Sequence, residues 1–266
     1  MRAASGGRPD TGSIAMTKTE VLLDIDAPHA SITFFTEDGI NILSPDVLHS
    51  FGAAVARISK DSRIRSTVVQ AKGKVFVAGA DIKVMKNYSA DEGRDYARLG
   101  QDVMNDLAAL PCVTVAAING AAMGGGLELA LACDFRIAVK SARLALPEAT
   151  LGLIPGWGGI PRLMKLIGPA RAKRLFLSGL PVSAEDGLAF GLVDEIVNSA
   201  EDLGPRVTAF CKSFRRASPA AVALAKRASR DLDDVSAFAE CFRTPDCREG
   251  MTAFLEKRPA SWMEEG

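Results

Sequence analysis

Histidine is scarce in this chain, and its cysteines show no pairing pattern. The two histidines, His29 and His49, lie far in sequence from the glycine-rich segments described below, which argues against a histidine-based triad or a histidine-rich metal site. The five cysteines form no Cys-x-x-Cys motif, and an odd number without regular spacing is typical of a reducing compartment. We therefore expect no metal centre and a cytoplasmic location.

Net charge and long apolar runs are also missing. Lys and Arg together number 32, as do Asp and Glu, so there is no bulk positive charge to attract nucleic acid. No apolar run reaches the roughly 18 residues of a membrane span, and the first 15 residues lack the apolar segment of a secretory signal. We expect neither a nucleic-acid nor a membrane partner, and we expect residues 1–16 to form a disordered extension.

Strands and helices alternate through most of the chain. Runs at 21–25, 31–35, 66–71 and 113–118 predict strands, and the last is apolar throughout, as in a strand covered on both faces. Ser44-Pro45 and the capping box of Ser89 with Glu92 predict helix starts. Beyond residue 198 the pattern is almost wholly helical. The sequence thus predicts an α/β core over residues 17–198 and a helical region over residues 199–266.

Two loops rich in glycine and alanine, residues 72–81 and 119–126, follow predicted strands and precede predicted helices. Small residues let a ligand approach the main chain, and the first N–H groups of a helix have no partner inside it. Side by side, two such loops could direct two N–H groups at one oxygen, as an oxyanion hole requires. A tight turn without a ligand is the alternative for either loop alone.

Two glutamates stand in apolar surroundings. Glu128 follows the second loop on the first turn of a predicted helix, and Glu148 follows Pro147. A carboxyl group in an apolar pocket has a raised pKa and can transfer protons near neutral pH, although spacing alone also fits two ordinary glutamates. A third loop, residues 154–159, could hold a water or an acyl oxygen, and its Trp157 could line a pocket or belong to the core.

Four segments together resemble the enoyl-CoA hydratase (crotonase) family, and the resemblance extends over residues 17–265. They are FVAGADIKVM at 76–85, INGAAMGGGLELALACDFRIA at 118–138, LPEATLGLIPGWGGIPRL at 146–163 and CREGMTAFLEKR at 247–258. The resemblance implies an α/β fold, the crotonase spiral of ββα units with a C-terminal helical trimerisation region. It also implies trimers, commonly stacked as hexamers.

The resemblance implies a role for individual residues. The main-chain N–H groups of Ala80 and Gly125 would form the oxyanion hole, Glu128 and Glu148 would be the catalytic glutamates, and Gly156 would help to position water. The residues expected to bind the substrate and its CoA part are Lys74, Ala78, Ala80, Asp81, Ile82, Lys83, Gly124, Gly125, Pro147, Gly156, Trp157 and Lys257, the last from a neighbouring subunit.

The implied reaction is addition of water to the 2,3 double bond of a 2-enoyl-CoA, with CoA as part of the substrate and no separate cofactor. The alternatives are that the protein isomerises a double bond, that it hydrates a branched or cyclic enoyl-CoA, or that it is an RNA-binding relative of the family. The chain departs from the family pattern at Asp38, Trp157 and Ile160-Pro161. These departures put one CoA phosphate contact in doubt and leave the length and shape of the acyl chain open.

Overall fold

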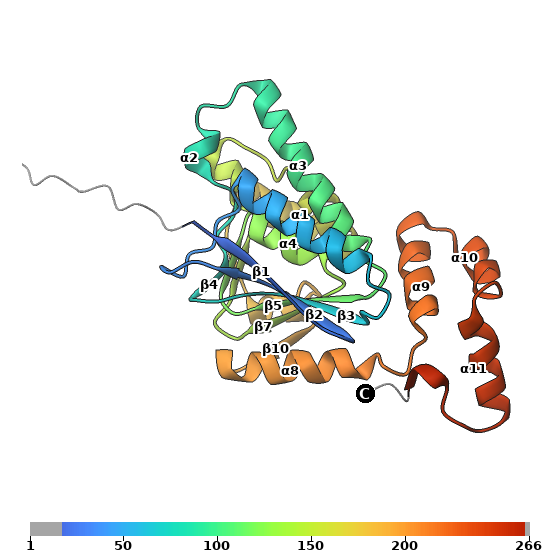
Figure 1. The fold of residues 1–266 in the computed structure, drawn as a ribbon. Coiled ribbons are helices and arrows are strands. Elements are labelled where there is room, and N and C mark those ends of the chain that lie inside the picture. Colours follow the sequence, from blue (N-terminus) through green and yellow to red (C-terminus); the bar gives the residue numbers. More distant parts are fainter. Residues whose placement is uncertain (1–17, 264–266) are drawn as a thin grey trace, which may run out of the picture.

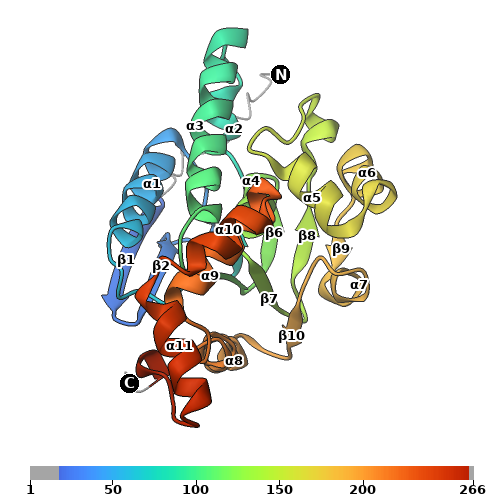
Figure 2. The same ribbon diagram turned by 90° about the vertical axis from the view of Figure 1, so that its right-hand side faces the viewer.

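Two β-sheets form the centre of the molecule (Figures 1 and 2). The computed structural model describes residues 18–263, so the extension expected over residues 1–16 lies outside the described residues. The larger sheet has the strand order β1 (Glu20–Asp26), β2 (His29–Phe35), β3 (Ser66–Ala71), β5 (Val113–Ile118), β7 (Phe135–Val139) and β10 (Glu195–Val197). Strand β1 is antiparallel to β2, and every later neighbour in this sheet is parallel.

The second sheet is smaller and has the order β4 (Val75–Val77), β6 (Ala121–Met123), β8 (Arg143–Ala145) and β9 (Val182–Ser183). Strands β4 and β6 correct the sequence prediction, which made both segments parts of loops. Each is only three residues long, and each is defined by pairing with the other, Val75 opposite Ala121, rather than by a local pattern. At Gly120 a Cβ atom would lie 2.2 Å from the carbonyl oxygen of Lys74, so only glycine fits where these strands meet.

Helices cover the larger sheet on both faces (Figure 1). On one face lie α1 (Pro45–Ser59), which Ser44 caps, and α3 (Ala90–Ala108), which begins with the predicted capping box of Ser89 and Glu92. Helix α8 (Ala200–Ser213) lies on the opposite face. The structure confirms both predicted helix starts. They could be predicted because each cap depends on residues only three positions apart.

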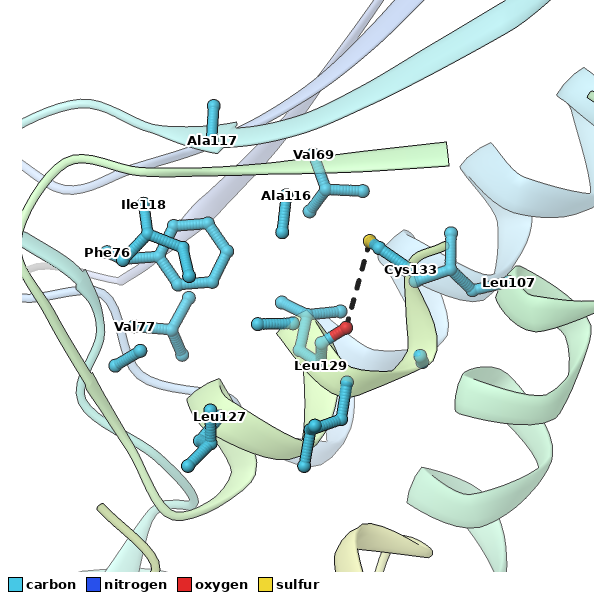
Figure 3. Close-up of a cluster of buried hydrophobic side chains, with 14 of the residues drawn as sticks. Val69, Phe76, Val77, Leu107, Ala116, Ala117, Ile118, Leu127, Leu129 and Cys133 are labelled. Carbon is cyan, nitrogen blue, oxygen red and sulfur yellow. Dashed lines mark hydrogen bonds between the residues drawn. The ribbon is translucent and has the colours of Figure 1, made fainter. Parts of the chain in front are cut away.

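Helix α4 (Gly125–Ala132) is buried along its whole length. Its Leu127 and Leu129 belong to the buried apolar cluster that also contains Phe76 and Ile118 (Figure 3). Burial of each such side chain contributes about 1.5–3 kcal/mol, so the helix has little freedom to shift. The position of every group at its N-terminus is therefore set by the core.

The remaining helices lie outside this centre. Helices α5 (Gly159–Ile167), α6 (Pro169–Ser178) and α7 (Ala184–Ala189) lie beside the smaller sheet, and α2 (Ile82–Met85) is a single turn (Figure 2). Three C-terminal helices, α9 (Pro219–Asp231), α10 (Asp234–Cys241) and α11 (Pro245–Leu255), project to one side (Figure 1). Among residues 18–263, no helix combines the length and the apolar character that a membrane crossing requires.

Candidate active site

The two predicted glycine-rich loops lie side by side. Gly79 has a left-handed φ of 112°, and its carbonyl oxygen accepts a 2.9 Å hydrogen bond from the N–H of Leu43. A Cβ atom on Gly79 would lie 3.0 Å from the carbonyl oxygen of Met123 and 3.7 Å from the nitrogen of Gly125. The peptide that carries the Ala80 N–H therefore lies next to the first residue of α4.

The glycines of the second loop are packed too closely to carry a side chain. Gly124 has a φ of 52°, and its N–H donates to the carbonyl of Ala145 over 2.9 Å, which holds the turn against β8. At Gly126 a Cβ atom would lie 2.2 Å from the carbonyl oxygen of Val77. Within residues 18–263, neither the Ala80 nor the Gly125 N–H donates a hydrogen bond to another part of the protein. Both donors remain available beside the positive end of the α4 dipole.

Glu128 lies one turn into α4 and is only 2% exposed. Its Oε1 accepts 2.8 Å hydrogen bonds from the N–H groups of both Trp157 and Gly159. Burial, with a smaller contribution from the charge of Glu148, raises the pKa of Glu128 to about 7, against the lowering effect of these two bonds and of nearby Arg162. A carboxyl group with such a pKa can both accept and release a proton near neutral pH.

Glu148 lies against Gly124, the residue that precedes α4. It begins the 3-10 turn η1 (Glu148–Leu151) after Pro147, and its Oε1 lies 2.8 Å from the point where a Cβ on Gly124 would stand. Partial burial raises its pKa. Its Oε2 is buried and has no hydrogen-bond partner among the described residues. Because buried polar atoms are nearly always paired, an unpaired carboxyl oxygen indicates a site that binds or reacts.

Sequence reasoning missed the network that supports Glu128. Arg162 donates from Nη1 to the Trp157 carbonyl over 2.9 Å and from Nη2 to Oδ1 of Asn105 over 2.6 Å, which ties the third loop to α3. This loop supplies both N–H donors to Glu128, and Gly159 was not predicted as one of them. The only available signal was an arginine one turn into the helix that follows three loop glycines.

The side chain of Trp157 belongs to the core. The sequence had left open whether it lies in the core or lines a pocket. It is 4% exposed and packs edge-to-face against Tyr96, with 5.4 Å between ring centroids. Its contribution to the surroundings of Glu128 comes from its main chain.

The residues expected to bind CoA are dispersed. Ala78 and Gly156 are half-buried, while Lys74, Ile82 and Lys83 are exposed at the surface around β4 and α2. The Asp81 carboxylate caps α2 by accepting a 2.9 Å bond from the N–H of Lys83. Lys257 follows the end of α11, which both ribbon views set far from α2 within one chain (Figures 1 and 2). Within residues 18–263, no cluster of three His, Cys, Asp or Glu side chains could hold a metal ion.

Two neighbouring main-chain N–H groups, one of them at the N-terminus of α4, and two carboxyl groups of raised pKa are the groups that an enzyme uses to stabilise a negative oxygen and to transfer protons. Comparison with known proteins narrows the class of enzyme. The model of the enoyl-CoA hydratase/isomerase family matches residues 25–265. The chain belongs to this family.

Individual relatives agree with this assignment. A crotonyl-CoA hydratase of Syntrophomonas wolfei is 37% identical over 261 residues, covering 94% of this chain and 100% of the relative. A short-chain-enoyl-CoA hydratase of Clostridium acetobutylicum is 37% identical, covering 91% and 97%. The crystal structure of an enoyl-CoA hydratase from Bacillus anthracis superimposes with a TM-score of 0.83 at 34% identity, covering 92% and 99%. The predicted α/β crotonase fold with a helical C-terminal region is confirmed.

Proposed function

We propose that this protein is an enoyl-CoA hydratase that adds water across the 2,3 double bond of a 2-enoyl-CoA to give a 3-hydroxyacyl-CoA. The observation that carries the proposal is the pair of glutamates with raised pKa values: Glu148 lies against Gly124, Glu128 lies in the helix that follows, and the charge of Glu148 raises the pKa of Glu128. Both relatives described above are named as hydratases of this substrate class.

The reaction needs a negative oxygen and two proton transfers. The thioester carbonyl oxygen would accept hydrogen bonds from the N–H groups of Ala80 and Gly125, and charge would develop on it as water attacks C3. One glutamate takes a proton from that water, and the other, in its protonated form, gives a proton to C2. Exchange of one proton between the two glutamates, directly or through solvent, then restores the starting protonation state. One such donor is typically worth ~10²–10³ in rate, and each positioned acid or base ~10²–10⁴.

The CoA part of the substrate would bind along the exposed edge formed by β4, the Gly79 loop and α2. Its binding energy would orient the acyl group at the reacting atoms. We propose no separate cofactor, since main-chain donors and carboxyl groups suffice for this chemistry. Lys74 and a neighbouring subunit's copy of the Lys257 position would meet the CoA phosphates.

The experiment is an assay of crotonyl-CoA hydration by loss of the enoyl-thioester absorbance, in the wild type, Glu128→Gln and Glu148→Gln. Each substitution should lower kcat about 10²–10⁴-fold, because it removes one proton-transfer group and keeps the shape. The matched control is Glu185→Gln, which changes a glutamate that is 63% exposed and paired with Lys140 at the surface. Undiminished activity in both site variants would overturn the mechanism.

We also propose that the protein assembles as trimers, stacked in pairs as hexamers, through its C-terminal helices, and that it is cytoplasmic. Support for assembly comes from large apolar side chains that are exposed on these helices: Leu232 83%, Val235 78%, Phe238 68%, Phe254 83% and Leu255 79%. Patches of this kind mark protein interfaces.

Support for the proposed cytoplasmic location, a reducing compartment, comes from the five cysteines, all of which are free.

A further inference from the structure

We propose that Trp157 and Tyr96 are positioning residues that hold the two main-chain donors of the oxyanion site at their working separation. This inference rests on the proposed function, because it assigns these rings a role in that reaction. The indole has no group that titrates near neutral pH, and the Tyr96 hydroxyl is buried and donates to the carbonyl of Leu43. Their importance lies in what each one touches.

The indole of Trp157 spans the space between α3 and the start of α4. A Cβ atom on Gly100 would lie 2.3 Å from its Cδ1, and a Cβ atom on Gly125 would lie 2.2 Å from its Cζ3. The two glycines therefore face opposite ends of the same ring system. Because no other residue type leaves room for the indole, the ring fixes how closely Gly125 approaches α3.

Tyr96 connects the other donor to the same ring. Its hydroxyl donates a 2.6 Å hydrogen bond to the carbonyl of Leu43, and the N–H of Leu43 donates over 2.9 Å to the carbonyl of Gly79. Leu43 also forms an isolated parallel bridge with Ala80. The peptide that bears the Ala80 N–H is thus held by Leu43, and Leu43 is held by Tyr96.

The two rings make these supports a single unit. They meet edge-to-face, with centroids 5.4 Å apart and an interplanar angle of 87°, which is a favourable geometry for aromatic pairs. The main chain of Trp157 also donates to Oε1 of Glu128 over 2.8 Å. One buried residue therefore contacts one donor through its ring, reaches the other through Tyr96, and holds a catalytic carboxyl group through its N–H.

The first test moves the indole without changing it. Gly100→Ala places a methyl group against Trp157 and should push the ring toward Gly125. We expect kcat for crotonyl-CoA to fall about 10-fold or more while KM stays within about twofold, since small displacements at reacting groups cost rate and CoA supplies most of the binding. The matched control is Gly93→Ala in the same helix, where a Cβ meets nothing within 4 Å and activity should be unchanged.

The second test cuts the connection at Tyr96. Tyr96→Phe keeps the ring and removes the hydrogen bond to Leu43. Its control is Tyr88→Phe: the Tyr88 ring packs against Tyr96, with centroids 5.7 Å apart, but its hydroxyl takes no part in the connection from Tyr96 through Leu43 to Gly79. The readout is the absorbance of bound cinnamoyl-CoA, which moves to longer wavelength when its carbonyl oxygen accepts hydrogen bonds. It is measured in a Glu128→Gln background, where turnover is slow. We expect the shift to shrink in Tyr96→Phe and to persist in Tyr88→Phe.

The outcomes separate the inference from the proposed function. A purely structural role would lower the melting temperature of Gly100→Ala and Tyr96→Phe but leave kcat and the spectral shift of the folded protein at wild-type levels, and that result overturns the inference. No hydration by the wild type would overturn the proposed function, while the spectral shift would still report whether the rings position the donors.

Discussion

The α/β core and the C-terminal helices differ in how far they bury their phenylalanine side chains. In the core, the large side chains of Phe34, Phe51 and Phe76 are fully buried. On α10 and α11, Phe238 and Phe254 are 68% and 83% exposed. The core buries these aromatic side chains, although it exposes single aliphatic ones such as Leu177, whereas the C-terminal helices present aromatic side chains that one chain leaves uncovered.

Carboxyl groups show a second contrast between the two regions. In the core site, burial raises the pKa values of Glu128 and Glu148. In the C-terminal helices, arginine partners lower them: Arg227 lowers the pKa of Glu240, and Arg258 lowers that of Glu249 to about 2. The core thus keeps acids of raised pKa where small residues crowd the main chain, and the C-terminal helices keep ionised acids at the surface.

The largest expected effect lies in the core site. Gly125→Ala would place a Cβ 2.2 Å from the Trp157 ring and displace the donor N–H. We expect kcat/KM for crotonyl-CoA to fall about 10²–10³-fold, the usual loss for one such donor. The control is Gly204→Ala in α8, where a Cβ meets nothing within 4 Å. Activity within twofold of wild type in Gly125→Ala would show that this N–H takes no part.

The next effect should appear in the C-terminal helices. Phe254→Asp puts a charge on an exposed apolar surface and should shift the assembly to monomers, measured as molar mass by light scattering, because a central aromatic side chain of an interface contributes about 2–4 kcal/mol. Leu177→Asp on α6, where the leucine is 67% exposed, is the matched control. If Phe254→Asp keeps the wild-type mass, the contrast between the two regions does not reflect assembly.

Local signals in the sequence predicted much of this molecule. Ser44-Pro45 and the box of Ser89 with Glu92 mark helix starts because each depends on neighbouring residues only. The apolar run of β5 predicted a buried central strand, which is confirmed. Glycine loops followed by a glutamate in apolar company indicated where Glu128 would lie, since few other roles suit a buried acid.

The rest depends on contacts between distant segments. Strands β4 and β6 exist because they pair with each other, and three residues carry no period that a pattern could reveal. The support of Glu128 joins α4 to a loop 29 and 31 residues later, and the Tyr96 hydroxyl reaches a carbonyl 53 residues earlier. No local rule predicts which carbonyl a buried hydroxyl will find.

A smaller effect should appear in the pH dependence of the stability of the core. The folded protein binds the Glu128 proton more tightly than the unfolded chain, because burial raises the pKa from the ordinary 4.5 to about 7. The stabilisation from this proton is complete below about pH 4.5 and is lost as the pH rises through 7. Glu128→Gln cannot ionise, so its free energy of unfolding should exceed that of the wild type by about 3 kcal/mol at pH 8.

Denaturant unfolding at pH 8 and at pH 4.5 checks this prediction, since the advantage of the variant should disappear at the lower pH. Glu185→Gln, at an exposed position, should show no such pH dependence. An advantage of equal size at both pH values would mean that packing, and not ionisation of Glu128, sets the difference.

The smallest effects should come from removing a helix N-cap in each of the two regions. Ser89 caps α3 in the core, and Thr244 caps α11 through a 3.3 Å bond from the N–H of Cys247. Alanine at either position should cost about 1 kcal/mol in the free energy of unfolding, measured by denaturant titration, because a side-chain cap satisfies a helix N–H wherever the helix lies. Ser229→Ala, late in α9, should change stability by less than about 0.5 kcal/mol. A full cost at Ser89 with none at Thr244 would mean that α11 unfolds separately from the core, because only a helix that unfolds with the rest contributes its cap to the measured transition.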